Sequence, residues 1–392
     1  MINKKVVIFV SIFLFCVSVL ASYTFFSNAG NITKSVSQKD QQPTVDPELL
    51  EPKTEECPIN GKMMTKKQKD SWSVRRPLGI AIENSTDARP QSGLSSADVV
   101  YEAVAEGGIT RFLAVYYCQD APIVGPVRSA RVHFITLLNE YGEYPLYAHV
   151  GGANCNKETG SGCANGAKAD ALGLIRKLGW EGYNDLNQFG VPFPYFWRDY
   201  ERLPNRSTEH TVYTSTKKLW EYAKNKRDLT NVDEDGVSWD ENFTSWNFQD
   251  DAKPEDRGIA AKIELGFWNA FSNDMAVVWN YDPKTNVYKR TNGGIAHVDK
   301  NTEKQLEVKN VIVVFAKESP ANDGYDGGHI LYQLTGTGDA LVFRNGKATE
   351  ASWTKKDGEA RMKFFDENDE EIEIVRGQVF IEILPTGNKV NY

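Results

Sequence analysis

The chain has little of the residues and motifs that carry several common chemistries. It has 5 His and 5 Cys among 392 residues, and no CxxC, GxSxG or HExxH motif occurs. The scattered histidines and the missing CxxC spacing argue against a metal site. Without the other two motifs, no serine or zinc hydrolase is predicted. No internal repeat is present, which argues against a solenoid. We therefore expect neither a resident metal nor a cofactor.

The chain also has no excess of basic residues, since it contains 45 Lys and Arg and 53 Asp and Glu, which gives a formal net charge of −8. Non-specific nucleic-acid binding needs a dense basic surface, so no nucleic-acid partner is expected. One basic pocket stays compatible with this balance, because net charge says nothing about a single cleft. A hydrophobic content of 41% predicts packed cores rather than disorder. The length has room for about two domains.

One long uncharged stretch, residues 6–26, follows Lys4 and Lys5. About 20 helical residues span a bilayer, so we expect a single-pass anchor in the cell membrane. The lysines place the N-terminus inside and the rest of the chain in the extracytoplasmic space. Two alternatives stay open: a secretory signal peptide cleaved after Ala21, and a lipoprotein with Cys16 as the acceptor. All three export the rest of the chain.

The remainder divides into four segments by composition. Residues 27–56 are polar and nearly free of aromatics, which predicts a flexible tether. Residues 57–225 mix strand and helix patterns, 226–257 form a charge-dense acidic linker, and 258–392 carry regular short strands with turn signals. We predict an α+β fold, with one transmembrane helix within 1–26 and the tether preceding a mixed α/β domain and then a β-rich domain.

Local patterns place the elements of the two predicted domains. Strand patterns within 57–225 occupy 77–84, 98–118, 144–152 and 210–215, and helix patterns occupy about 129–141, 167–180 and the stretch after 215. Gly107-Gly108 divides 98–118 into a hairpin, because tight hairpin turns need positive φ. In 258–392 the Asn345-Gly346 pair predicts another hairpin, within a twisted sheet or a partly closed barrel.

Four cysteines lie beyond the N-terminal stretch: Cys57, Cys118, Cys155 and Cys163. In an exported protein an even count permits disulfides, and four cysteines allow three connectivities. Cys155 and Cys163 bracket a Gly-rich loop, so we expect them to form a local disulfide.

Several long motifs resemble the DUF3048 family. "RPLGIAIENSTDARPQSGLSSADVVYEAVAEGGITRFLAVYY", "VGPVRSAR" and "EHTVYTS" are similar to its N-terminal domain, and "VVWNYDPKTNVYKRTNGGIAHVD" and "LTGTGDALVFRNGKATEASWTKKD" are similar to its C-terminal domain. The resemblance covers nearly all of 71–392. It implies a two-domain bacterial surface protein without an established activity. The family's lipoprotein members need small residues beside the acceptor cysteine; Cys16 lacks them, which favours a membrane helix here.

The candidate site centres on arginines. In "VGPVRSARVHF" a Gly-Pro turn precedes Arg128 and Arg131, and a helix is expected to follow. Free backbone N–H groups and two guanidinium groups would then meet an anion. Arg111, just past the Gly-Gly turn, would join them if the hairpin packs alongside. The alternative is that these arginines pair with Glu102 or Glu106 and only pin loops.

Polar residues at other strand ends extend this candidate site. The loop "ENSTDARPQSG" offers Glu83, Asn84 and Arg89 at the end of a strand, where α/β sheets place ligands. Glu83 is also a candidate internal partner for the arginines. His149 and His210 lie at strand boundaries and would line the same cleft, although the absence of a nucleophile motif favours structural roles for both.

These observations predict an extracytoplasmic envelope protein whose arginines receive an anionic cell-wall ligand or the carboxylate of an envelope protein. One alternative is an enzyme acting on a lipid pyrophosphate precursor, because the element order is loosely similar to the LytR-CpsA-Psr phosphotransferases. That alternative requires the arginines in a pocket with carboxylates or a histidine. The other is a non-catalytic scaffold that docks partners through its β-rich domain, with the arginines consumed by internal salt bridges.

Overall fold

The computed structural model describes residues 13–20, 22–24, 51–260 and 262–392. The chain divides into two compact units, 1–51 and 52–392. Of the segment expected to cross a membrane, 13–20 and 22–24 are helical, and the rest lies outside the described residues. Among the described residues, no helix combines the length and the apolar character that crossing a membrane requires.

The folded part begins before residue 57, because the last residues of the expected tether 27–56 form a strand. Strand β1 (Lys53–Glu56) pairs antiparallel with β2 (Met63–Thr65). Helix α3 (Lys66–Trp72) follows directly and begins at Thr65, whose side chain accepts a hydrogen bond from the Gln68 backbone in a capping box. The polar composition of 27–56 concealed this strand, and 27–50 lie outside the described residues.

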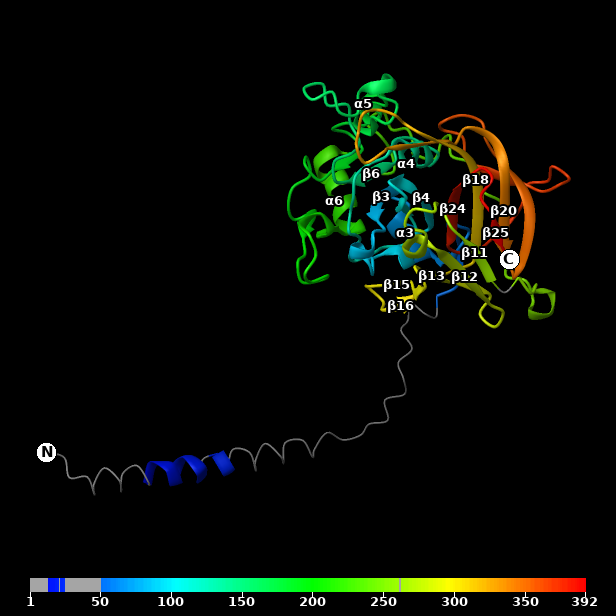
Figure 1. The fold of residues 1–392 in the computed structure, drawn as a ribbon. Helices are drawn as coiled ribbons and strands as arrows, with labels where there is room; N and C mark the ends of the chain where they lie inside the picture. The colour runs from blue at the N-terminus through cyan, green and yellow to red at the C-terminus, as the bar shows by residue number, and fades with distance from the viewer. Residues whose placement is uncertain (1–12, 21, 25–50, 261) are drawn as a thin grey trace. The chain divides into compact units, whose positions relative to one another are not determined.

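Strands from both halves of the sequence form one 11-stranded sheet, in the order β22-β21-β20-β18-β24-β4-β5-β3-β6-β7 with β19 paired to β18. In Figure 1 the red strand β24 lies beside the cyan strand β4. The bounds are β3 (Leu78–Glu83), β4 (Val99–Glu106), β5 (Ile109–Tyr116), β6 (Leu146–His149), β7 (Asp185–Asn187), β18 (Asn310–Pro320), β19 (Ile330–Gln333), β20 (Gly336–Arg344), β21 (Lys347–Lys355), β22 (Lys363–Phe365) and β24 (Val379–Pro385).

The pairing of β24 with β4 joins the two regions that the sequence suggested as separate domains. β24 lies parallel to both β4 and β18, so it bridges the two halves of the sheet. Its sequence, VFIEILP, is buried along nearly its whole length, as expected for a central strand covered on both faces. The predicted α/β and β-rich regions therefore share one sheet within one compact unit.

A second, six-stranded sheet consists of β11 (Lys262–Leu265), β12 (Val277–Asp282), β13 (Val287–Asn292), β14 (Ile295–Ala296), β17 (Glu307–Val308) and β25 (Val390–Asn391). Three two-stranded pairs complete the strands: β8 (Phe196–Arg198) with β9 (Val212–Thr214), β10 (Phe248–Gln249) with β23 (Ile374–Val375), and β15 (Val298–Asp299) with β16 (Lys304–Gln305). The fold is thus β-rich with few helices, as the α+β prediction implies in outline.

The α-helices within residues 51–392 of the described part are short. Besides α3 they are α4 (Val132–Leu138), α5 (Ala171–Lys177), α6 (Thr216–Arg227) and α7 (Ser272–Met275). The helix expected over 129–141 begins later, because Arg131 is its cap residue and has an extended backbone with φ −134° and ψ 148°. α4 packs its apolar side chains into the core and has no polar side-chain cap.

Both predicted hairpin turns are confirmed. Gly107 and Gly108 connect β4 to β5 with φ of 61° and 91°, and Asn345 and Gly346 connect β20 to β21 with φ of 51° and 68°. These left-handed values are what tight hairpin turns demand. Local turn chemistry was therefore readable from the sequence.

The expected linker 226–257 is packed against the rest of the molecule. Trp239 and Trp246 are buried, and Trp246 donates its indole N–H to the Met362 carbonyl at 2.7 Å. β10, near the end of this segment, pairs with β23. The segment is irregular in sequence but contributes to the core.

Candidate functional site

The carboxyl ends of three parallel strands gather several of the predicted site residues. β3, β6 and β7 run parallel to one another and end at Glu83, His149 and Asn187. The arginine loop reaches the same edge, because the Arg128 backbone N–H donates to the Ala81 carbonyl of β3 at 2.8 Å. This is the edge of a sheet at which α/β proteins commonly bind ligands.

Arg111 and Arg131 are consumed by one carboxylate at this edge. Arg111 contacts Glu106 at 3.0 Å, and the Arg131 Nε donates to the other Glu106 oxygen at 2.9 Å. Burial opposes ionisation of Glu106, but the two guanidinium groups lower its pKa to about 2. Arg111 also donates to the Ser129 carbonyl at 2.9 Å. These two arginines therefore fasten the β4–β5 hairpin to the arginine loop.

Arg128 is in a different situation from its two neighbours. Its Nε lies 3.5 Å from Glu83 in a long ion pair, and its side chain is 29% exposed. Glu83 also contacts the His210 Nδ1 at 2.8 Å and accepts a hydrogen bond from the Ser85 hydroxyl at 3.0 Å. The structure thus brings together Arg128, Glu83 and His210 and leaves part of the guanidinium open to solvent.

The remaining predicted residues make internal contacts. Arg89 donates to the Asn84 side chain at 3.1 Å and to its carbonyl at 2.8 Å, and Gln91 donates to the same Asn84 amide oxygen at 2.9 Å. His149 is fully buried, with Nε2 2.6 Å from Asp185. These contacts hold the β3 loop and the β6–β7 ends, and His149 does not line an open cleft.

A larger cationic site lies elsewhere on the molecule, and the sequence did not indicate it. A cavity of about 720 Å³ is lined by Lys62, Ser95, Ser96, Gln119, Val287, Lys289, Thr302, Lys304, Gln305, Glu307, Val308, Lys309, Arg376, Gly377 and Gln378. We call it the basic groove. Five of these side chains are cationic, one carboxylate lies among them, and none is aromatic.

Three of the five cations hold carboxylates at the surface. Lys289 contacts Asp282 at 2.9 Å, Lys309 contacts Asp251 at 2.7 Å, and the Arg376 Nε contacts Asp250 at 2.9 Å. These ion pairs are partly exposed, with side-chain exposures from 22% at Lys309 to 89% at Asp250, and Arg376 also pairs with Glu56. Exposed pairs of this kind are weak, so a competing anion can draw the cations away from them.

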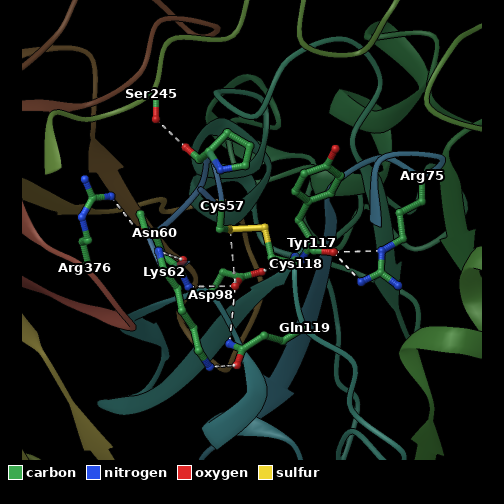
Figure 2. Close-up of a disulfide and its surroundings, with 12 residues drawn as sticks. Cys57, Asn60, Lys62, Arg75, Asp98, Tyr117, Cys118, Gln119, Ser245 and Arg376 are labelled. Carbon is green, nitrogen blue, oxygen red and sulfur yellow. Dashed lines mark hydrogen bonds between the residues drawn. A yellow bond between two sulfur atoms is a disulfide. The ribbon is translucent and has the colours of Figure 1, made fainter. Parts of the chain in front are cut away.

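Lys62 and Lys304 have no carboxylate partner among the described residues. The Lys62 Nζ donates to the Gln119 amide oxygen at 2.6 Å, and burial lowers the pKa of Lys62 even though Asp98 opposes the shift. Figure 2 shows the Lys62 side chain directed at Gln119 beside the disulfide. In the part of the chain that the structure describes, the Lys304 ammonium has no ion pair or hydrogen bond.

The Cys57–Cys118 disulfide fixes the turn that carries Lys62. It joins residues 61 apart, and the Asn60 side chain donates to Asp98 at 2.8 Å beneath it (Figure 2). The Asp98 carboxylate also accepts the Tyr117 and Cys118 backbone N–H groups, yet burial raises its pKa to about 6. A second disulfide joins Cys155 to Cys163, the pair expected from the sequence.

A buried ionic cluster joins the two halves of the large sheet. Arg290 of β13 pairs with Glu102 of β4, and its Nε lies 3.7 Å from Glu382 of β24; all three side chains are fully buried. The sequence signal for such a cluster is a glutamate in the middle of an apolar strand, as in VVYEAVAE and VFIEILP. Removing charges from water requires pairing of this kind.

Two family models, one relative and one solved structure match this chain. The family described as "Protein of unknown function (DUF3048) N-terminal domain" matches residues 64–230, and the family described as "Protein of unknown function (DUF3048) C-terminal domain" matches 267–381. The protein titled "Putative lipoprotein YerB" of Bacillus subtilis (strain 168) is 31% identical over 327 residues, which are 83% of this chain and 83% of that relative. The crystal structure of the YerB protein from Bacillus subtilis superposes with a TM-score of 0.63 and 27% identity, covering 86% of this chain and 100% of that chain.

Proposed function

This chain belongs to the DUF3048 family, and from that premise we propose that it is an envelope-associated protein that binds a multiply charged anion in the basic groove. The relative titled as a lipoprotein supports the envelope location, and all three sequence interpretations of the N-terminus export the folded unit. The single observation that carries the binding proposal is the basic groove itself, with five cations and one carboxylate along a cavity of about 720 Å³.

The charge arrangement favours a ligand with several negative groups. The five cations come from separate segments, so one small monovalent anion would meet only some of them. Lysine ammonium groups bind phosphate as point charges, and flexible lysine stems can follow successive groups along a chain. The absence of aromatic lining argues against recognition by base or sugar stacking. A chain of phosphate groups, as in anionic cell-wall polymers, fits this groove.

The arginine loop supports a second candidate. Arg128 lies beside the Glu83–His210 pair. An enzyme acting on a phosphorylated envelope precursor would need such a cation for the phosphate together with a carboxylate or histidine for proton transfer. Arg111 and Arg131 are buried against Glu106, with side-chain exposures of 5% and 7%, whereas the Arg128 side chain is 29% exposed. This candidate predicts that substitution of Arg128 abolishes anion binding. Substitution of the lysines in the basic groove should then leave anion binding unchanged.

Calorimetric titration of the oxidised full-length chain with inorganic triphosphate separates the two. The Lys62→Gln/Lys304→Gln variant should lose most of the binding, whereas Arg128→Gln should bind as the parent does. Lys66, on α3 with a 77% exposed side chain, provides a matched control as Lys66→Gln. Binding that survives the groove variant and disappears in Arg128→Gln would reject the groove, and release of phosphate would then favour the enzyme.

Membrane attachment through the N-terminal segment is part of the proposal. The described helical residues of this segment expose large apolar side chains, including Phe13, Leu14 and Phe15. Fractionation of cells expressing the full-length chain should place it in the membrane, and deletion of residues 1–26 should release it. Loss of the segment from the mature protein by mass spectrometry would favour a cleaved signal peptide, and a lipid-modified Cys16 would favour a lipoprotein.

A further inference from the structure

A second cavity, of about 420 Å³, lies between the loop after β3 and the turn that joins β13 to β14. We call it the Arg89 pocket, and its lining residues belong to a different set from those of the basic groove. It is lined by Thr86, Arg89, Pro90, Asp274, Asn292, Gly293, Ile295, Ala296, His297 and Val298. The lining combines apolar side chains with a small number of polar groups, which is the usual composition of a small-molecule site.

Arg89 is a cation without a carboxylate partner in this pocket. Its guanidinium donates to the Asn84 side chain, the Asn84 carbonyl and the Asp274 carbonyl, at 3.1, 2.8 and 2.8 Å. Within the described residues no carboxylate oxygen lies at ion-pair distance from it. Burial lowers the pKa of Arg89 to about 10, with the nearby Arg290 adding to the shift, so the group stays charged at neutral pH. A fourth N–H is directed at the Met275 sulfur at 3.4 Å, so one of the five N–H donors stays available to a ligand.

Asn292 supplies an unused acceptor beside this cation. Asn292 is 3% exposed, and its side-chain oxygen Oδ1 is buried without a hydrogen-bond partner. Its amide nitrogen is directed at the Asp274 and Ala276 carbonyls, both at 3.4 Å, which assigns the other atom as the acceptor. A buried polar atom without a partner is costly, and this oxygen has almost no accessible surface. A turn of the Asn292 side chain toward the cavity that it lines would let a ligand N–H relieve that cost.

The apolar side of the pocket is open to a small hydrophobic group. Pro90, Ile295, Ala296 and Val298 lie there, and Ile295 is 74% exposed. Ile295 and Ala296 form β14, which is an edge strand of the six-stranded sheet among the described residues. An extended ligand could therefore lie along an edge strand while its side chain covers Ile295.

We propose that the Arg89 pocket binds the C-terminal residue of a peptide that ends in a small apolar side chain and a free carboxylate. The carboxylate pairs with Arg89, and the apolar side chain packs against Ile295 and Val298. The Asn292 side chain turns toward the cavity on binding, and its Oδ1 then accepts a hydrogen bond from the amide N–H of the terminal residue. Asp274 lines the pocket, and its charge acts on Arg89. The repulsion between that charge and a bound anion is smaller for a monovalent carboxylate than for a dianionic phosphate, so the carboxylate is the better match. A fatty acid would satisfy Arg89 but would leave Asn292 Oδ1 without a donor.

The test uses N-acetyl-valine and its methyl ester as probes against the full-length chain, with affinity measured by ligand-observed NMR. The acid should bind in the millimolar range or tighter, and the ester should bind at least about tenfold more weakly, because it cannot accept a charged hydrogen bond from Arg89. Octanoate, which has the carboxylate but no amide N–H, should bind more weakly than N-acetyl-valine.

Matched variants locate the site. Ile295→Asn should weaken N-acetyl-valine binding about fivefold through lost apolar contact. Ile259→Asn makes the same exchange at a residue that is 96% exposed and outside the pocket, and it should change nothing. Arg89→Met should weaken binding about tenfold or more, provided that its melting temperature stays near that of the parent.

Four outcomes would overturn the proposal. They are equal affinities for acid and ester, parental affinity in Ile295→Asn, tighter binding of octanoate than of N-acetyl-valine, and no binding up to about 10 mM. The ester and Ile295→Asn comparisons stand even if Arg89→Met fails to fold. Because the basic groove is lined by other residues, failure here leaves the triphosphate experiment unaffected.

Discussion

Replacing Arg290 by methionine should destabilise the whole folded unit in a single transition. Arg290 is fully buried, pairs with Glu102 on β4 and lies 3.7 Å from Glu382 on β24. Its guanidinium also lies 5.0 Å from the centre of the Phe380 ring. Methionine keeps much of the apolar stem and removes the charge, so the change reports mainly on the ion pair.

The magnitude follows from leaving a buried carboxylate without its cation. Removing one partner of a buried ion pair costs about 3–5 kcal/mol, against a total stability of about 5–15 kcal/mol for a typical domain. Glu382 provides the matched comparison. Burial, with Glu102 adding to the effect, raises its pKa far above the usual range, which favours the neutral carboxyl. Glu382→Gln therefore replaces one neutral group by another and should cost less than about 1 kcal/mol.

Urea denaturation of the oxidised full-length chain, followed by near-ultraviolet circular dichroism, measures both changes. Arg290→Met should shift the single transition to lower urea with an unchanged slope, and Glu382→Gln should leave it nearly in place. Equal costs for the two variants would show that Glu382 is ionised and would refute the reasoning. Two separate transitions would instead show that the halves of the large sheet unfold independently.

Three further predictions concern single sites. Burial raises the pKa of Asp98 from 3.8 to about 6, so the folded state binds the proton more tightly than the unfolded state does. The free energy of unfolding should therefore rise as pH falls from about 7 to 5. Asp98→Asn should lack that rise when urea titrations are compared across pH. Replacing Cys57 and Cys118 by serine should cost about 4 kcal/mol by the same method, because the disulfide closes a loop of 61 residues, and an unchanged midpoint would contradict this. Arg128→Ala should change the melting temperature little, whereas Arg131→Met should lower it clearly, since Arg131 is buried against a carboxylate and Arg128 is partly exposed.

Local signals in the sequence were sufficient to predict many of the strands and turns. The Gly107-Gly108 and Asn345-Gly346 turns require positive φ, and short apolar runs next to turn residues, such as LGIAIE after Pro77, favour buried strands, so these features were predictable. Element ends were less predictable. The helix expected from 129 begins at Val132, because the loop before it is held extended by contacts with distant strands such as β3.

Long-range pairing was not predictable in the same way. β24 pairs with β4 although Val379 and Val99 are far apart in the chain, and no local pattern selects one apolar strand as the neighbour of another. The same limit applied to the candidate site. The arginine cluster could be read from spacing, but whether Glu106 pairs with Arg111 and Arg131 depends on how a hairpin packs. The basic groove is assembled from segments as distant as Lys62 and Arg376.

Lysine acetylation, measured by mass spectrometry with and without inorganic triphosphate, tests the groove most directly. The proposal predicts that triphosphate protects Lys304 and Lys309 from the reagent, while the exposed Lys66 on α3 reacts equally in both samples. Equal labelling of Lys304 with and without a saturating concentration of triphosphate would contradict the claim that the basic groove binds the anion.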